Sequence, residues 1–313
     1  MQRKRFQNNM AESRFSLTVT ALLCAAVWGA AIFFDHSIWP SLVCLIICTY
    51  LMVELNNTNA LIRIFSRMVS CTFLALSTMC VFLYPSWIPM FIMLCVIAFY
   101  RLSFHCYQNN HSPGHIFHAY LFIGVASIAF VQILYFLPVL WFITIVYLQA
   151  FSFRTFIASL LGVITPYWFL IGYDVFFNNI DGFIDHFGQL AVYGPLADFS
   201  NLTLVHYISV GFIVLLAVIG TFHFWLTSSN DKIRTRTLYQ VFIMMTVATL
   251  VFIVLQPQFI EELTGLLIIN VSPLAAHFIA LTRSKWTNIS TIVLMILTLF
   301  ITIFNLWTFS LNF

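Results

Sequence analysis

The chain has 313 residues, of which 62% are hydrophobic and only 7% are charged, with a net charge of +3. A soluble domain carries about a quarter of its residues as charged ones, so this composition excludes an ordinary soluble protein. The seven cysteines contain no CxxC pair. We therefore expect the cysteines to be small packing residues rather than parts of a disulfide framework or ligands of a metal.

Apolar runs separated by short turn signals divide the chain into membrane helices. A helix needs about 20 apolar residues to cross a hydrocarbon core of about 30 Å. The run 138–153 is the shortest, and the first run is too long for the apolar part of a cleaved signal peptide. The sequence predicts an all-α polytopic bundle, one membrane domain over 1–313, with about eleven spans: 16–34, 38–55, 68–84, 87–104, 115–135, 138–153, 156–177, 204–226, 238–256, 262–281 and 287–309.

The charges fix the orientation of these spans. With the N-terminus in the cytoplasm, all 13 Lys and Arg residues fall in segments that face the cytoplasm, and seven of the ten acids face the other side. Lys and Arg in short loops mark the cytoplasmic side of a membrane. The pattern predicts a cytoplasmic N-terminus and an extracytoplasmic C-terminus, because one span more or less in mid-chain would put basic clusters on the wrong side.

The long extracytoplasmic segment after the seventh predicted span contains a short amphipathic pattern. Ile180, Phe183, Ile184 and Phe187 recur at three- and four-residue spacing, and the acids between them fall on the opposite face. Such a pattern indicates a helix that lies in the membrane interface rather than crossing it. We expect an interfacial outer helix over 180–191.

Acidic residues on the extracytoplasmic side are the candidate catalytic groups. Asp35 follows the first span, as a catalytic acid does in several membrane glycosyltransferases, and Asp181, Asp185 and His186 lie in the long outer segment. Paired carboxylates can act as general acid and base or bind a divalent ion. A solvated acidic rim imposed by the topology explains the same residues.

Histidines on the cytoplasmic side are the candidate metal ligands. His115 and His118 would share one face at the start of a helix, and imidazole suits Zn, Cu or Fe. Their spacing matches no metal signature, and interfacial histidines that contact water are the simpler interpretation, so we expect no metal. The sequence contains no P-loop, GxGxxG, GxSxG or HExxH motif and no basic patch, which predicts no cofactor and no nucleic-acid partner.

Two short stretches carry a resemblance to a known family. The residues 151–154 (Phe-Ser-Phe-Arg) and 161–167 (Leu-Gly-Val-Ile-Thr-Pro-Tyr), together with 55–67 and 107–135, resemble an uncharacterised family of multi-pass inner-membrane proteins of Bacteroidota. The resemblance covers about a third of the chain, and Thr155 departs from the acid that often follows the arginine in that family. It implies an inner-membrane location in a diderm envelope and no established activity.

Three functions remain open at this point. We expect a non-enzymatic inner-membrane protein that handles a lipidic or envelope component or holds partners together, with membrane lipids and other envelope proteins as its partners. A secondary transporter would need broken helices around a polar cavity, for which Gly162 with Pro166 and Asn270 with Pro273 are the candidate positions. An outer-leaflet enzyme acting on a lipid or lipid-linked sugar would need Asp35, Asp185 and His186 to converge.

Overall fold

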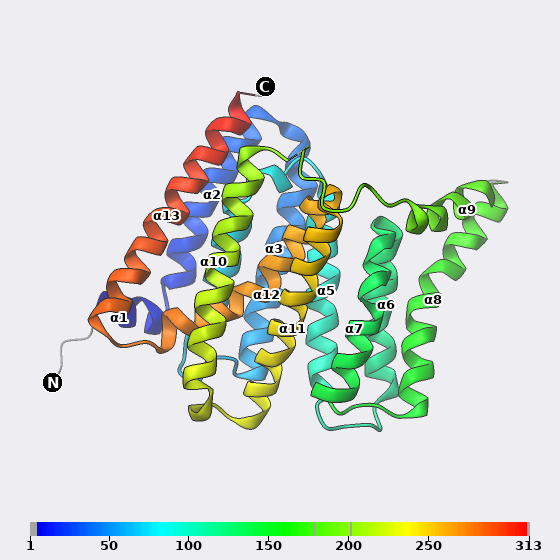
Figure 1. Cartoon of the computed structure of the whole chain (residues 1–313), viewed down its shortest axis with the longest axis horizontal. Helices are drawn as coiled ribbons and strands as arrows, with labels where there is room; N and C mark the ends of the chain where they lie inside the picture. The colour runs from blue at the N-terminus through cyan, green and yellow to red at the C-terminus, as the bar shows by residue number, and fades with distance from the viewer. Residues whose placement is uncertain (1–4, 178–179, 201, 312–313) are drawn as a thin grey trace.

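A computed structural model of the chain describes residues 5–177, 180–200 and 202–311. Within these ranges the chain forms thirteen α-helices and no β-strand, which confirms the all-α class (Figure 1). The helices are α1 (Phe6–Glu12), α2 (Ser16–Phe34), α3 (Trp39–Asn59), α4 (Met68–Met79), α5 (Trp87–His105), α6 (Pro113–Ala129), α7 (Leu137–Phe142), α8 (Phe153–Phe176), α9 (Ile180–Gly188), α10 (Leu204–Thr227), α11 (Ile233–Leu255), α12 (Ile260–Leu281) and α13 (Lys285–Ser310).

Eight helical segments of the described chain are long and apolar enough to cross a membrane. They begin at Ser16, His36, Trp87, Phe153, Leu204, Ile233, Pro257 and Lys285. The three other predicted spans correspond to shorter apolar helices, at Met68–Met79, Pro113–Ala129 and Val131–Tyr147. The last of these joins a 3₁₀ turn, α7 and a π turn. The sequence predicts one span over 68–84, but α4 has only 12 residues. Because an α-helix rises about 1.5 Å per residue, α4 is shorter than that predicted span. Its helix ends at Met79 and a 3₁₀ turn follows (Val81–Leu83).

Charged residues separate to the two ends of the bundle. The connections α1–α2, α3–α4, α10–α11 and α12–α13 carry basic residues, while Arg101 of α5 and Arg154 of α8 lie near the α5–α6 and α7–α8 connections. All six connections lie at the lower end in Figure 1. We call this the basic end. The opposite end, called the acidic end, has the α2–α3, α8–α10 and α11–α12 connections.

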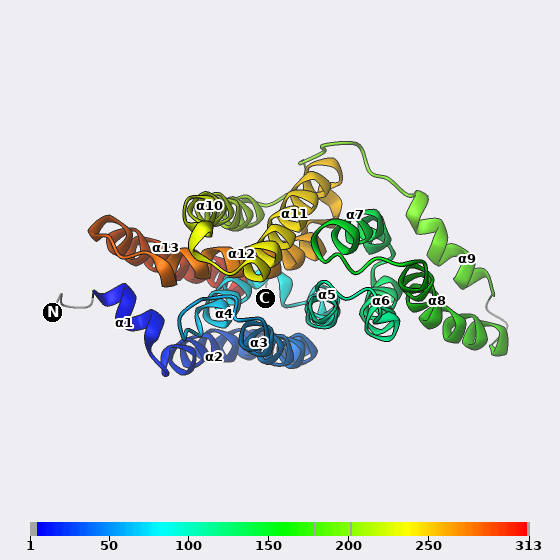
Figure 2. The ribbon, with the colours of Figure 1, turned by 90° about the horizontal axis from the view of Figure 1, so that it is seen from below.

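The α12 helix forms the centre of the bundle. It packs against α4, α5, α10 and α11, and Figure 2 shows it surrounded by them. Every residue from Leu263 to Ala280 is buried. A helix that is apolar all round belongs inside the protein rather than at its lipid-facing surface, and its two acids, Glu261 and Glu262, lie in its first turn, where the helix dipole favours negative charge.

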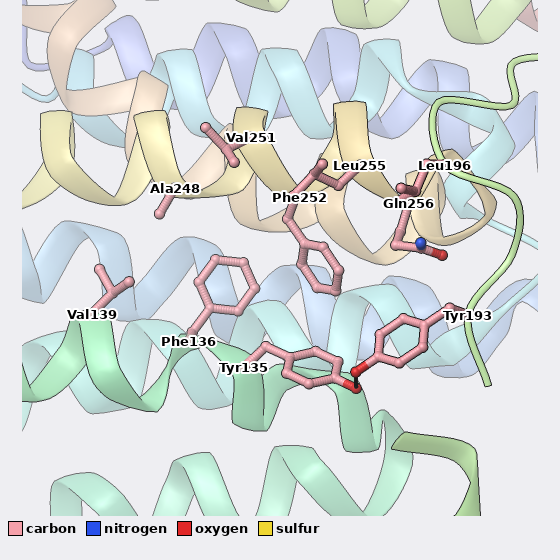
Figure 3. A pocket seen from close by; sticks show the side chains of 10 residues that line it. All are labelled: Tyr135, Phe136, Val139, Tyr193, Leu196, Ala248, Val251, Phe252, Leu255 and Gln256. Carbon is pink, nitrogen blue, oxygen red and sulfur yellow. Dashed lines mark hydrogen bonds between the residues drawn. The ribbon is translucent and has the colours of Figure 1, made fainter. Parts of the chain in front are cut away.

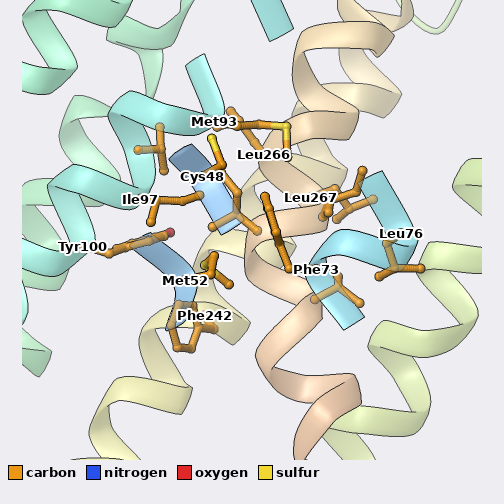
Figure 4. Close-up of a cluster of buried hydrophobic side chains, with 14 of the residues drawn as sticks. Cys48, Met52, Phe73, Leu76, Met93, Ile97, Tyr100, Phe242, Leu266 and Leu267 are labelled. Carbon is orange, nitrogen blue, oxygen red and sulfur yellow. The ribbon is translucent and has the colours of Figure 1, made fainter. Parts of the chain in front are cut away.

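Large apolar side chains from five helices pack around α12. Figure 4 shows this core between α3, α4, α5, α11 and α12, with Phe73, Phe242 and Leu266 among its members. One polar pair lies within it, where the Tyr100 hydroxyl donates to Asn270 Oδ1 over 2.6 Å, and Asn270 Nδ2 donates to the Leu266 carbonyl at 2.8 Å. Both polar side chains are thus satisfied inside an otherwise apolar core.

The α6 and α8 helices pack closely because glycines face the contact. A Cβ atom at Gly124 would lie 2.6 Å from the Val163 carbonyl oxygen, and one at Gly162 would lie 2.5 Å from that of Phe117. Small residues let helix backbones approach in this way. The chain continues from α8 into α9 at the edge of the molecule (Figure 1), followed by a 3₁₀ turn at Gln189–Ala191.

Two glycines of α10 provide a matched test of this packing. A Cβ atom at Gly220 would lie 2.7 Å from the Leu274 carbonyl carbon of α12, whereas one at Gly211 would meet nothing within 4 Å. Gly220→Ala should lower the free energy of unfolding by about 1–3 kcal/mol, the usual effect of overpacking. Gly211→Ala should leave it unchanged or raise it by up to about 1 kcal/mol, since alanine favours helix. Thermal unfolding in mild detergent measures both, and equal stability of the two variants would contradict the close α10–α12 contact.

Candidate functional site

A cleft of about 180 Å³ lies between α2 and α13, with α4, α10 and α12 behind it. Figure 2 shows α1 at the basic end of these two helices, and Met10 of α1 lines the cleft. The α2 residues that line it recur at helical spacing, so one face of α2 forms its wall. The lining contains no charged residue; it consists of Met10, Thr20, Leu23, Cys24, Val27, Met68, Cys71, Thr72, Ala75, Leu76, Thr78, Leu216, Ala275, Ile279, Leu294, Met295, Thr298, Leu299 and Thr302.

The threonines of this cleft do not require a polar guest. Four of their hydroxyls donate to carbonyl groups of their own helices at 2.7 to 2.9 Å, those of Thr20, Thr72, Thr298 and Thr302. The fifth, on Thr78, accepts from Trp28 Nε1 at 3.3 Å. The cleft is therefore apolar in effect. Cavities of roughly 150 Å³ with apolar walls stay dry and take apolar guests.

Hydrogen bonds hold α13 at both of its ends and leave its middle beside the cleft. Towards the acidic end, Asn305 Nδ2 donates to the Met79 carbonyl at 2.7 Å and to Ser209 Oγ at 2.8 Å. At the basic end, the Gln7 backbone N–H of α1 donates to Asn288 Oδ1 at 3.0 Å. Gln7 Nε2 also donates to the Ile279 carbonyl of α12 at 2.6 Å. The helix is fixed at two points, and the residues between them, 294–302, line the cleft.

A second pocket, of about 310 Å³, lies between α7 and α11 (Figure 3). Phe136, Val139, Val251 and Phe252 are among its apolar walls. Its polar edge consists of groups that bind the chain itself. The Tyr135 and Tyr193 hydroxyls lie 2.8 Å apart, and Tyr135 also donates to the Leu190 carbonyl.

Gln256 holds the segment between α9 and α10 over this second pocket. Its Oε1 accepts from the Gly194 N–H at 3.0 Å, and its Nε2 donates to the Gly194 carbonyl at 3.3 Å. The Ala197 N–H donates to the Leu255 carbonyl at 3.4 Å. These bonds fasten the segment between α9 and α10 to the end of α11, so the polar groups of this pocket are already used by the fold.

A buried polar cluster joins four segments at the basic end. His277 Nε2 of α12 lies 2.9 Å from Asp231 Oδ2 in the α10–α11 connection, and His277 Nδ1 lies 3.2 Å from His223 Nδ1 of α10. Arg63 Nη1, from the α3–α4 connection, lies 3.7 Å from Asp231 Oδ1. Asp231 and His277 are buried, with side-chain exposures of 1% and 0%.

One arrangement of protons satisfies the hydrogen bonds of both histidines. With both rings neutral, His277 donates from Nε2 to the Asp231 carboxylate, so its Nδ1 must accept from His223 Nδ1–H, because a neutral imidazole has one donor nitrogen. Arg63 balances the charge of Asp231. None of these residues lines either of the two pockets. The cluster is therefore a structural contact that joins connections at this end rather than a substrate site.

The structure separates the candidate acids. Asp35 is half-buried and caps the 3₁₀ turn His36–Ile38, where it accepts from the Ser37 N–H at 2.7 Å and from the Ser37 hydroxyl at 2.9 Å. The α2–α3 connection lies far along the molecule from α9 (Figure 1). Asp35 therefore does not converge with Asp185 and His186.

On α9 the two acids and the histidine differ in environment. Asp181 and Asp185 are exposed, while His186 is half-buried with its ring 5.9 Å from that of Tyr167. Burial lowers the pKa of His186, and the Ser127 backbone and Asp174 oppose this shift. Phe187 packs on Tyr167 at 4.8 Å and Phe183 on Phe187 at 5.1 Å, while Ile184 remains 62% exposed. The apolar face of α9 thus packs partly on α8.

The histidines His115 and His118 are both exposed at the start of α6. The ring of His105 lies 6.4 Å from that of His115. Among the described residues, no group of three or more His, Cys, Asp and Glu side chains could hold a metal ion.

The candidate residues from the sequence do not include His223, His277 or Asp231, which the fold brings together. The one clue in the sequence is the predicted topology, which places His223, Asp231 and His277 at or near the cytoplasmic ends of their spans. Their contact depends on how α10 and α12 rotate against each other, which periodicity does not determine.

Comparison with known proteins adds no further assignment. No protein-family description matches the chain. No curated protein sequence and no solved structure matches it.

Removal of His277 tests the buried cluster. His277→Phe keeps an aromatic ring but leaves the Asp231 carboxylate without its nearest donor, which should lower the free energy of unfolding by about 1.5–3 kcal/mol. The exposed His118→Phe should change it by less than about 0.5 kcal/mol. In a double-mutant cycle with Asp231→Asn, purely additive effects would contradict a direct His277–Asp231 interaction.

Proposed function

We propose that the chain is a multi-pass inner-membrane protein whose basic end faces the cytoplasm. The separation of charged connections to two ends supports this orientation, because Lys and Arg in short loops stay on the cytoplasmic side. The resemblance to inner-membrane proteins of Bacteroidota supports the location. On this proposal the short helices α4, α6 and α7 cross with the eight long segments, giving eleven spans with the C-terminus outside.

Within that membrane, the chain handles a lipidic component without catalysing a reaction on it. The observation that carries this proposal is the α2–α13 cleft, whose lining has no charged residue and whose threonine hydroxyls all have partners. Lipid acyl chains surround membrane-spanning helices, and they are the apolar guests available there. The occupant we propose is an acyl chain of a membrane lipid.

The alternatives fit the geometry less well. A transporter would use broken helices around a polar cavity, but α8 continues through Gly162 and Pro166, and α12 continues through Asn270 and Pro273. Both pockets are lined mainly by apolar residues. An outer-leaflet enzyme would need its acids together, and Asp35 caps its own turn away from α9. A pure scaffold would have no need for an apolar cleft.

A bulky side chain in the cleft tests this proposal. Ala75 of α4 lines the cleft, whereas Ala25 of α2 is exposed on the bundle surface. Ala75→Trp should reduce the lipid that remains bound to the purified protein by about tenfold or more. Displacing two buried methylene groups, at about 0.8 kcal/mol each, is sufficient for that loss. Ala25→Trp should retain lipid as the wild type does.

Native mass spectrometry in mild detergent counts the bound lipids. If Ala75→Trp lowers stability as well, the smaller Ala75→Leu keeps the comparison with Ala25→Leu. Wild-type protein that carries no lipid, or equal lipid retention in the two tryptophan variants, would favour the scaffold over a lipid-handling role.

A further inference from the structure

The stripe of α4 that lines the cleft continues to an arginine at its basic end. Arg67, Cys71 and Ala75 follow one another at intervals of four residues, and the Cys71 N–H donates to the Arg67 carbonyl at 3.1 Å. Residues at this spacing lie on one face of a helix, and their side chains tilt toward its N-terminus. Cys71 and Ala75 line the cleft, so Arg67 lies on the same face, one turn closer to the basic end.

Arg67 contrasts with three other arginines at this end, whose side chains have partners. Arg63 pairs with Asp231, Arg101 pairs with Glu54, and Arg234 donates to Asn59 Oδ1 and to the Phe104 carbonyl. Arg67 is half-buried. Within the residues that the structure describes, its side chain forms no ion pair and no hydrogen bond. An arginine at a helix end at the membrane boundary extends its charged group to the interface, where lipid headgroups lie.

The segments around this end of the cleft are strongly basic. They are α1 with the residue before it, the α1–α2 connection, the residue before α4, and the α12–α13 connection with the first residue of α13. The only acid within them is Glu12, and their basic residues in the described chain are Arg5, Arg14, Arg67, Arg283 and Lys285. The cleft therefore combines an apolar interior with a positively charged mouth.

From this combination we infer that the cleft selects an anionic phospholipid, with an acyl chain in the apolar interior and the headgroup phosphate on Arg67. The inference rests on the proposed function and names its substrate class. Guanidinium groups bind phosphate through two parallel hydrogen bonds, and basic residues beside a membrane attract anionic lipids. The proposed topology puts this mouth in the cytoplasmic leaflet.

The positive-inside pattern alone does not explain Arg67. That rule requires basic residues in cytoplasmic loops, and Arg14, Arg154 and Lys232, all exposed there, satisfy it. It does not require an arginine to be half-buried on the stripe that lines an apolar cleft.

Lipid titration followed by native mass spectrometry tests the inference. The probes are phosphatidylglycerol and phosphatidylethanolamine with identical acyl chains, added to delipidated full-length protein. Wild-type protein should prefer phosphatidylglycerol. Arg67→Gln should weaken phosphatidylglycerol binding about fivefold, as expected for one basic group near an anionic lipid, and should leave phosphatidylethanolamine binding unchanged. Arg67→Lys should restore part of the preference.

The control is Arg154→Gln, because Arg154 is exposed at the same end but begins α8, away from the cleft. It should behave as the wild type. Equal binding of the two lipids by the wild type, or no effect of Arg67→Gln, would overturn the inference while leaving acyl-chain binding intact. Failure of both lipids to bind would instead refute the proposed function. Displacement of phosphatidylglycerol by equimolar glycerol phosphate would also overturn the inference, because it would indicate a site for a water-soluble phosphate.

Discussion

A backbone buried away from water must find all its hydrogen-bond partners inside the protein, and α12 is the element on which this constraint acts most strongly. Pro273 removes one donor from the middle of this buried helix. The carbonyl that loses its donor within the helix is that of Ile269, four residues earlier. Neighbouring helices place hydroxyl groups at the carbonyls beside the proline. Thr72 Oγ1 lies 2.9 Å from the Ser272 carbonyl oxygen as well as 2.8 Å from that of Met68, so its one proton is shared between them, and the Tyr239 hydroxyl donates to the Pro273 carbonyl at 3.3 Å. These side-chain contacts and the packing around them join α4 and α11 to α12.

The periphery is held differently from the centre. Around α12 the contacts are tight, as the approach of Gly220 to Leu274 illustrates. On the α2–α13 side, α13 is fixed near its two ends, through Asn305 and through α1. These contacts lie near the ends of α13, and the apolar gap lies along its middle. A rigid centre with a peripheral cleft is a suitable arrangement for holding a lipid chain, and the charged mouth adds a means to choose among lipids.

The sequence predicted the helices better than their contacts. Apolar runs predicted all eight helical segments that are long and apolar enough to cross a membrane. The one-sided basic residues agree with the two ends of the bundle. Both patterns can be read without knowledge of the tertiary packing. Asp35 is a turn residue in the structure, where it accepts from Ser37 two residues later, a role that aspartate commonly has in turns. Its place after the first span suggests a catalytic acid only by analogy.

Other features required the fold itself. The 12-residue length of α4 depends on the break after Met79, which lies in an uninterrupted apolar run. The cleft and the pairing of His277 with Asp231 depend on how helices far apart in sequence rotate against one another. Arg67 counted in the sequence as one of many cytoplasmic basic residues, and only its place on the cleft stripe distinguishes it.

The most direct measurement of the central claim is a map of where a lipid chain lies. A phospholipid with a photoactivatable group in the middle of one acyl chain is incorporated with the protein into vesicles, irradiated, and the labelled residues are identified by mass spectrometry. The account predicts labels concentrated on the cleft-lining faces of α2 and α13, at 20–27 and 294–302, above the labelling of exposed residues such as Trp168 and Phe169 of α8, which are 75% and 73% exposed. Labels spread over the surface in proportion to exposure, with none enriched in the cleft, would contradict it.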